Sequence, residues 1–258
     1  MTADETRKIF SEKRVGVLIP VYNNEKTVLQ VVESVLPFCA DVIVVNDGST
    51  DQTETLLSKL PESVHIVSYL PNKGKGYALK AGFEKALEMG LRSVVSMDSD
   101  GQHLASDLPL FAEACQEDED ALIVGSRSFL NPNMPQKNSF ANKFSNFWFA
   151  LQTGHRLPDT QTGYRLYPLE RMKGMTPFCR RYEAELELLV RSAWRAIRLK
   201  SISINVFYPP KEERVTHFRP TVDFVRISLL NTLLCVLAVV YGYPSMAIRK
   251  IWNFIIRK

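Results

Sequence analysis

Short apolar runs alternate with helix-like patterns along the first half of the chain. The runs are rich in β-branched residues, which is typical of buried strands, and apolar residues recur at helical spacing between them. This alternation predicts an α/β fold with an open, mainly parallel sheet flanked by helices. The expected strands are Val15–Ile19, Val42–Val45, Val64–Val67, Val94–Met97 and Ala121–Val124, and the expected helices are Val28–Val35, Thr53–Leu60, Tyr77–Met89 and Leu108–Cys115.

Polar or glycine-containing segments follow each of these five strands. Ligand sites of open α/β sheets lie beyond the carboxyl ends of the strands. Any one segment could be a plain turn, since Asp-Gly-Ser and Asn-Lys-Gly are common turn sequences. Five of them at one edge of a sheet favour a binding site. They are Pro20–Glu25, Asn46–Asp51, Pro71–Gly76, Asp98–His103 and Gly125–Arg127.

The segment Asp98-Ser99-Asp100 indicates a metal site. Residues i and i+2 of an extended segment point the same way, so the two carboxylates would repel each other without a cation between them. Mg²⁺ and Mn²⁺ prefer oxygen ligands and often bridge to substrate phosphates. Gln102 adds a neutral oxygen nearby. We therefore expect Asp98, Asp100 and Gln102 to hold a divalent cation, the alternative being a solvated acidic turn.

A basic, glycine-containing loop, Lys73–Gly76, opens the helix expected from Tyr77. Glycines let a backbone approach a ligand closely, and a helix N-terminus favours anions. The spacing is not that of a Walker A motif, and no Gly-x-Gly-x-x-Gly fingerprint follows the first strand. An anion held here is therefore not expected to bind as in a P-loop kinase or a Rossmann dehydrogenase.

Composition narrows the class of protein. The 258 residues suffice for one large α/β domain, and the net charge of +4 gives no reason to expect nucleic-acid binding. The four cysteines are too far apart for a metal knuckle or a small disulfide scaffold, which favours a reduced, cytoplasmic setting. The first residues are polar and acidic and do not resemble a signal peptide.

The C-terminal part differs from the rest. Ile227–Tyr243 carries no charge and would span about 25 Å as a helix, against about 30 Å of bilayer hydrocarbon. Pro244 is expected to break it, and a basic amphipathic helix with Trp252 follows, with its apolar side formed by Ile248, Ile251, Trp252 and Ile255. We predict a catalytic domain over residues 1–220 and a membrane-associating tail over 221–258. The alternative is a core helix followed by a docking helix.

Several motifs together resemble the family-two inverting glycosyltransferases, most closely the dolichyl- or polyprenyl-phosphate sugar synthases. The resemblance covers about residues 14 to 210. In combination the motifs are specific for the family but not for the sugar or the acceptor. They are Ile19–Asn23, Val45–Asp51, Asn72–Gly76, Asp98–His103, Gly125–Arg127 and Asp159–Tyr167.

The resemblance implies a GT-A fold, a nucleotide-sugar donor such as a UDP- or GDP-sugar, and Mg²⁺ or Mn²⁺ bound by Asp98, Asp100 and Gln102 on the donor diphosphate. Many relatives carry an acidic residue directly after the Asn of the first motif. Here Asn24 takes that place and Glu25 follows, so either is a candidate to meet the nucleotide. The implied donor-binding residues are Pro20, Tyr22, Asn24, Glu25, Asp47, Lys75 and Asp98.

On the acceptor side, the resemblance implies that Arg127 faces a phosphate, if the acceptor has one. Glu185 lies where many members carry an acidic base, and Asp159 is the other candidate. A phosphate acceptor is mostly dianionic at neutral pH and needs positioning more than a base, whereas a hydroxyl acceptor needs a carboxylate base. The basic loop Lys211–Pro220 is a further candidate to cover the donor diphosphate.

The expected function is inverting transfer of a sugar from a nucleotide-sugar to a lipid-linked acceptor at the cytoplasmic membrane face. One alternative is the same chemistry on a glycolipid or glycan hydroxyl. Another is an inactive nucleotide-sugar-binding protein, against which the Asp98/Asp100/Gln102 set speaks. A nucleotidyltransferase would need a glycine-rich basic loop after the first strand, and Pro20–Glu25 is not one.

Overall fold

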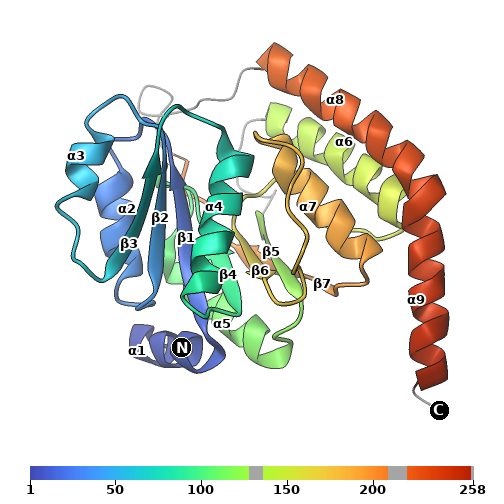
Figure 1. The fold of residues 1–258 in the computed structure, drawn as a ribbon, viewed down its shortest axis with the longest axis horizontal. Coiled ribbons are helices and arrows are strands. Elements are labelled where there is room, and N and C mark those ends of the chain that lie inside the picture. Colours follow the sequence, from blue (N-terminus) through green and yellow to red (C-terminus); the bar gives the residue numbers. More distant parts are fainter. Residues whose placement is uncertain (128–135, 209–219, 257–258) are drawn as a thin grey trace.

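The computed structural model describes residues 1–127, 136–208 and 220–256. They form a seven-stranded sheet with helices on both faces (Figure 1). The strands are β1 (Val15–Val21), β2 (Val42–Asp47), β3 (Val64–Tyr69), β4 (Ser93–Ser96), β5 (Leu122–Arg127), β6 (Arg165–Pro168) and β7 (Leu199–Ile204). The helices are α1 (Ala3–Lys13), α2 (Val28–Val35), α3 (Thr53–Leu57), α4 (Lys75–Glu88), α5 (Leu108–Glu117), α6 (Gln136–Thr153), α7 (Glu183–Trp194), α8 (Pro220–Leu237) and α9 (Tyr243–Ile256).

The strand order is β3-β2-β1-β4-β6-β5-β7. All neighbours pair in parallel except β6, which runs antiparallel to both β4 and β5. The predicted mainly parallel sheet is therefore confirmed. Because β6 runs the other way, its first residue, Arg165, pairs with Ser96 at the end of β4. The segment before β6 thus lies at the same edge as the carboxyl ends of the parallel strands.

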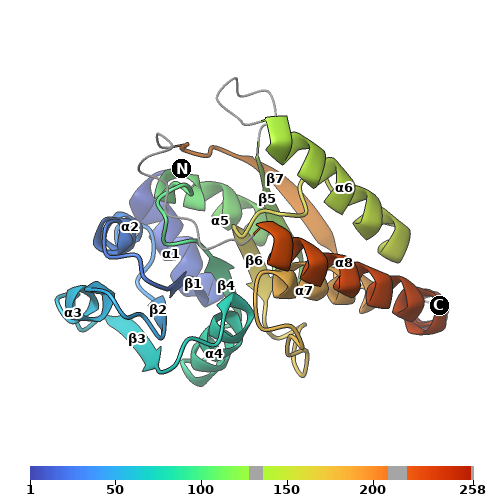
Figure 2. The same cartoon turned by 90° about the horizontal axis from the view of Figure 1, so that it is seen from above.

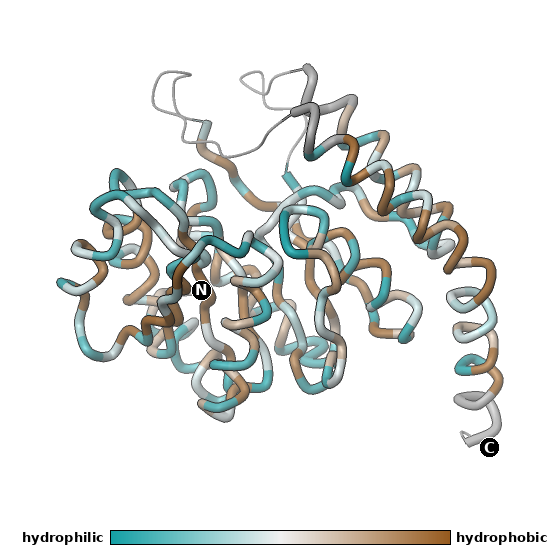
Figure 3. The backbone as a smooth tube through the Cα atoms, turned by 45° about the horizontal axis from the view of Figure 1, so that its top comes forward, coloured by the Kyte–Doolittle hydropathy of each residue, from teal (hydrophilic) through white to brown (hydrophobic). Residues whose placement is uncertain are grey.

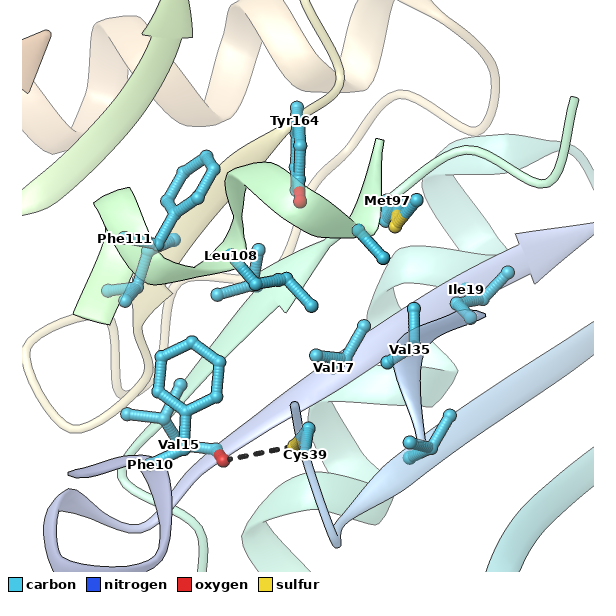
Figure 4. Close-up of a cluster of buried hydrophobic side chains, with 14 of the residues drawn as sticks. Phe10, Val15, Val17, Ile19, Val35, Cys39, Met97, Leu108, Phe111 and Tyr164 are labelled. Atoms are coloured by element: carbon cyan, nitrogen blue, oxygen red, sulfur yellow. Dashed lines mark hydrogen bonds between the residues drawn. The ribbon is translucent and has the colours of Figure 1, made fainter. Parts of the chain in front are cut away.

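Strand side chains alternate between two cores, one on each face of the sheet. Val15, Val17 and Ile19 of β1 point into the first core, which is packed by α1, α2, α3 and α5 (Figure 4). Leu18 points into the second core, which is packed by α4, α6, α7 and α8. Seen from above, the two groups of helices lie on opposite sides of the strands (Figure 2). Both faces are buried, which explains the continuous apolar runs of the sequence.

Three helices, α1, α6 and α7, are not among the elements expected from the apolar pattern. The N-terminal helix α1 begins with a capping box: Glu5 N–H donates to Thr2 Oγ1 (3.2 Å), and Thr2 N–H donates to Glu5 Oε2 (2.8 Å). It is anchored by Phe10, which is buried in the first core. Helix α6 covers the second core through Phe149.

The tail differs from its predicted form. Pro244 does not end the helix: a π-helical turn, Ala238–Gly242, joins α8 to α9, and Pro244 lies in the first turn of α9, where a proline needs no N–H partner. The helical stretch Val225–Ile251 has 27 residues and a mean hydropathy of 1.9 in its most apolar window, of which 28% is buried. By length and composition it could cross a membrane. Apolar residues recur along α8 in Figure 3.

One side of the tail packs on the domain. Leu230, Leu234 and Ala238 are buried in the second core. The buried Gln152 of α6 donates its side-chain amide to Asn231 Oδ1 (2.9 Å). The boundary between domain and tail at residue 221 stays a prediction, since α8 contributes side chains to the core of the domain.

Candidate active site

The loops that follow β1 and β4 are held together by a buried asparagine. Asn24 donates its amide to the carbonyl oxygen of Ser99 (2.7 Å) and lies 3.0 Å from the Ser99 hydroxyl, and its own oxygen accepts from Thr27 (2.9 Å). Glu25 is exposed and accepts from the backbone N–H of Gln52 (2.9 Å). Asn24 therefore fixes the backbone between Asp98 and Asp100, and Glu25 is the more accessible of the two.

Pro20 and Tyr22 lie at the end of β1, between the ends of β2 and β4 in the sheet order. Both are partly exposed. Pairing of β1 with β4 ends at Leu18, so a proline at position 20 fits the strand end, where the ladder no longer needs its N–H on that side. A change in strand order at β1 and β4 is the usual place for a ligand in such sheets.

Asp47, the last residue of β2, is held by fixed donors. One oxygen accepts from Lys73 N–H (2.8 Å), and the other accepts from Gly74 N–H (2.8 Å) and the Asn72 amide (2.9 Å). Burial raises the pKa of this carboxyl above its ordinary value despite these bonds. Asp47 therefore shapes the Asn72–Gly74 loop, and its predicted contact with a nucleoside stays a prediction.

The N-terminus of α4, which was expected to bind an anion, contacts another part of the chain. The N–H groups of Gly76 and Tyr77 donate to the carbonyl oxygen of Arg180, at 2.8 and 3.3 Å, instead of pointing to a ligand. Gly74 has a φ of +95°, and a Cβ on it would overlap the same carbonyl. The two glycines therefore allow the Arg180 backbone, rather than an anion, to approach the helix start closely. These two amides are not available as the expected anion site.

Lys75, the first residue of α4, joins two carboxylates. Its ammonium lies 2.6 Å from Asp98 Oδ1 and 3.1 Å from Glu185 Oε1, and its side chain is 15% exposed. Burial works against the charge of Asp98, but the ammonium of Lys75 outweighs it, so the pKa of that carboxyl is lowered. Burial raises the pKa of Glu185 above its ordinary value, although Lys75 opposes this. The structure thus brings together three residues that the sequence predicted separately.

Asp100 lies beside this cluster. Burial, followed by the charge of Asp98, raises its pKa to about 6. One of its oxygens accepts from the backbone N–H of Gln102 (3.0 Å), and the Gln102 carbonyl accepts from Phe207 N–H (2.9 Å). A role for the Gln102 side chain in metal binding stays a prediction.

The carboxylate oxygens of Asp98 and Asp100 are suitable ligands for a hard divalent cation such as Mg²⁺. In the part of the chain that the structure describes, no three His, Cys, Asp or Glu side chains are arranged around a common metal position. Mg²⁺ does not need three, because it is commonly held by one or two carboxylates together with substrate phosphates and water. Asp98 and Asp100 supply oxygen ligands only, and the pKa of Asp100 is raised partly by Asp98, a repulsion that a cation between them would relieve.

His103 is a site residue that sequence reasoning quoted without assigning a role. It is buried, stacks on Tyr164 with ring centroids 4.9 Å apart, and accepts the N–H of Asp98 on Nδ1 (3.2 Å). Burial lowers its pKa to about 4. A neutral ring that accepts on Nδ1 carries its proton on Nε2. His103 therefore fixes the backbone of Asp98, and its place five residues after Asp98 was the only signal for this.

Arg127, the last residue of β5, is anchored by Asp159. Its Nε lies 2.6 Å from Asp159 Oδ2 and its Nη2 lies 3.0 Å from Oδ1, a bidentate pair. Asp159 is fully buried, and its Oδ1 also accepts from Gln161 N–H (3.0 Å). Although burial opposes the charge, Asp159 raises the pKa of Arg127. Asp159 thus orients Arg127, and both of its oxygens have partners, which weakens its candidacy as a base.

The remaining candidates are only partly described. The basic loop Lys211–Pro220 falls almost wholly outside the described residues. The same holds for Arg257 and Lys258 of the tail and for the side chains of Trp252 and Ile255.

Solved structures with the same architecture are glycosyltransferases of the GT-A fold. Glucosyl-3-phosphoglycerate synthase from Mycobacterium tuberculosis, crystallised with Mn²⁺, UDP-glucose and phosphoglyceric acid, matches with a TM-score of 0.65. The match covers 92% of this chain and 84% of that one at 20% identity. The fold is therefore GT-A, as predicted.

The model of the family "Glycosyl transferase family 2" matches residues 16–172. The chain belongs to this family. A UDP-N-acetylglucosamine–dolichyl-phosphate N-acetylglucosaminyltransferase from Methanococcus voltae is 29% identical over 77% of this chain and 87% of its own length. A polyprenol monophosphomannose synthase from Mycolicibacterium smegmatis is 32% identical over 61% of this chain and 63% of its own.

Proposed function

We propose that this glycosyltransferase transfers a sugar from a UDP- or GDP-sugar to a polyprenyl- or dolichyl-phosphate type acceptor, with inversion at the anomeric carbon and with a divalent cation. The observation that carries the proposal is the arrangement of charge at one sheet edge. Asp98 and Asp100 follow β4, and Arg127 ends β5 with Asp159 holding its guanidinium. One group suits a metal-bound diphosphate and the other suits a second phosphate.

The donor side is assigned to the loops after β1, β2 and β4. Asp98 and Asp100 would hold Mg²⁺ or Mn²⁺, which supplies positive charge for the leaving diphosphate. Pro20, Tyr22 and Asp47 would line the nucleoside pocket. Asn24 and His103 keep the backbone around the two aspartates in place through their hydrogen bonds. The crystal contents of the structural relative, Mn²⁺ with UDP-glucose, support this assignment by analogy.

The acceptor side is assigned to Arg127. An arginine whose guanidinium is held in one plane by a buried aspartate keeps a fixed orientation and stays charged, which favours positioning of a phosphate over proton transfer. A phosphate monoester is mostly dianionic at neutral pH. Its oxygen can attack the anomeric carbon from the face opposite the leaving group without a general base, and this gives inversion. The named acceptors of the two sequence relatives support the assignment.

A membrane-facing surface supports a lipid-linked acceptor. Leu229, Leu233 and Val240 of the tail are 66%, 55% and 73% exposed, and Phe147 on the neighbouring α6 is 60% exposed. Apolar side chains that are exposed to water and lie close together on one surface are expected to bind a membrane. We assign the protein to the cytoplasmic face of the membrane, in a peripheral or monotopic form, because that face gives access to cytoplasmic nucleotide-sugars.

The function is tested by supplying labelled UDP- and GDP-sugars with a short-chain polyprenyl phosphate and Mn²⁺. We expect a sugar-phosphate-lipid product of inverted anomeric configuration with one donor. Arg127→Ala should raise the acceptor KM by about tenfold or more with little change in the donor KM. Arg127→Lys is the matched control, because lysine keeps the positive charge but cannot form the two parallel hydrogen bonds of a guanidinium. An effect on the donor KM alone would overturn the acceptor role.

Membrane attachment is tested by flotation with anionic vesicles. Leu229→Ser with Leu233→Ser should release the protein into the soluble fraction, because both side chains point away from the core. Leu87→Ser is the matched control: Leu87 is an exposed residue of α4, 43% exposed, outside the tail. Equal flotation of the two variants would count against the tail as the membrane-binding surface.

A further inference from the structure

We infer that Lys75 competes with a divalent cation for the carboxylate of Asp98. When the cation binds, the Lys75 ammonium moves from Asp98 to the carboxylate of Glu185. The inference rests on the proposed metal role of Asp98. It makes Lys75 and Glu185 positioning residues that set the affinity of the metal site. It also gives Glu185 a role that needs no proton abstraction.

The distances support competition for one carboxylate. Lys75 Nζ lies 2.6 Å from Asp98 Oδ1, a charge-assisted contact as short as such contacts become. A cation that bound Asp98 would bring a second positive charge close to this ammonium. Two cations that close repel each other strongly in a poorly solvated site. The ammonium must therefore loosen its hold on Asp98 before a metal ion can bind there.

Glu185 provides the place for the displaced charge. Its Oε1 lies 3.1 Å from the same ammonium, and its side chain is 9% exposed. A buried charge that loses its partner is costly. With Glu185 in place, a small movement of the flexible lysine side chain leaves the ammonium paired. Without Glu185, the ammonium would have to stay with Asp98 or remain unpaired.

The surrounding backbone keeps the three groups close together. A Cβ on Gly163 would lie 2.8 to 2.9 Å from Lys75 Nζ, Asp98 Oδ2 and Glu185 Oε1 at once, so only glycine leaves room for them. The start of α4 is bonded to the Arg180 carbonyl, shortly before α7, which places Lys75 beside Glu185. The buried Arg165 donates to the Glu185 carbonyl oxygen (2.6 Å) and fixes the first turn of α7.

The charges of the cluster favour one added cation. The carboxylates of Asp98, Asp100 and Glu185 lie in the surroundings of two cations, Lys75 and Arg165. The Arg165 side chain is tied to the backbone carbonyls of Glu185 and Thr160 and cannot follow the metal. Lys75 is therefore the group in this cluster that can move between two carboxylates.

The test is a double-mutant cycle on Mn²⁺ affinity, measured by electron paramagnetic resonance with Mn²⁺ alone and again with UDP. Lys75→Met keeps an unbranched side chain without the charge and should bind Mn²⁺ about tenfold more tightly than the wild type. Glu185→Gln should bind Mn²⁺ about tenfold more weakly, because Lys75 then has only Asp98 as a partner. In the double variant, the effect of Glu185→Gln should disappear.

The outcomes separate the alternatives. If Glu185→Gln weakens binding equally with and without Lys75, then Glu185 is a metal ligand and the inference is wrong. If Lys75→Met binds Mn²⁺ no better than the wild type, the competition is absent. Lys75→Gln replaces Lys75→Met if the latter does not give a folded protein by circular dichroism. A wild type whose Mn²⁺ affinity is unchanged by Asp98→Asn would instead overturn the proposed metal site itself.

Discussion

Two aspartates at the ends of strands β2 and β4, which flank β1 in the sheet, are held in opposite ways. Asp47, the last residue of β2, accepts hydrogen bonds from two backbone amides and a side-chain amide, all at 2.8 to 2.9 Å. Asp98, after β4, is paired with the charged side chain of Lys75. Backbone donors cannot leave without unfolding the loop, whereas an ammonium on a flexible stem can be replaced by another cation. The first carboxylate is thus part of the scaffold, and the second is suited to exchange its partner.

The largest expected effect is on turnover, when Asp98, the carboxylate with the exchangeable partner, is replaced. Asp98→Asn should lower kcat by roughly 10²–10³-fold while the protein stays folded, because the charge proposed to face the cation is lost. Turnover of a nucleotide-sugar with a polyprenyl phosphate measures this. Asp120→Asn, a half-exposed acid in the turn before β5, is the control and should leave kcat unchanged. Full activity of the wild type in excess chelator would contradict the metal role.

The same change at Asp47 should act on stability first. Asp47→Asn replaces one of the two accepting oxygens by an –NH2 group that can only donate, so at least one of the three hydrogen bonds is lost, and it should lower the free energy of unfolding by about 2 kcal/mol. Urea denaturation, followed by circular dichroism, measures this. Asp98→Asn serves as the comparison and should cost clearly less. An equal loss of stability in both variants would remove the distinction between the two carboxylates.

Substitution of Asp100 by Asn should have the opposite effect on stability in the metal-free protein: the free energy of unfolding should rise. Its pKa is raised from 3.8 to about 6 in the folded state. An acid with a raised folded-state pKa destabilises the fold above that pKa, and the cost vanishes below the unfolded-state value. Asp100→Asn should therefore raise the free energy of unfolding by roughly 2 kcal/mol at pH 8, measured in chelator.

This gain should shrink as the pH falls from 6 towards 4. A gain that is independent of pH would show that the carboxyl is not the cause. With saturating Mn²⁺ the wild type should recover the stability that Asp100→Asn gains, because a bound cation cancels the repulsion.

Much of the fold could be predicted because each strand of the first half is a continuous apolar run. The strand-end residues Asp47, Asp98 and Arg127 were found for the same reason, since their position after a run places them at the ligand edge. Helix α1 was predictable from Thr2 and Glu5, whose spacing is that of a capping box, but its apolar face is small. The antiparallel direction of β6 has no local signature in four residues.

Partners that are distant in the sequence could not be predicted. Lys75 and Glu185 are brought together by the packing of α4 on α7, and no local pattern records their distance. The glycines at 74 and 76 suggested a ligand, but they accommodate the Arg180 backbone instead. A close backbone approach has the same sequence signature whether the neighbour is a phosphate or another part of the chain.

The antiparallel strand β6 also sets the distance between the proposed donor side, at the end of β4, and the proposed acceptor side, at the end of β5. It lies between β4 and β5, so the strand that ends before Asp98 and the strand that ends with Arg127 are two strand spacings apart. Neighbouring strands are about 4.8 Å apart, which gives a separation of about 10 Å. Were β4 and β5 adjacent, the proposed metal site and the proposed acceptor arginine would be only one strand spacing apart. The inserted strand thus leaves room for a donor sugar between the proposed metal site and the proposed acceptor arginine.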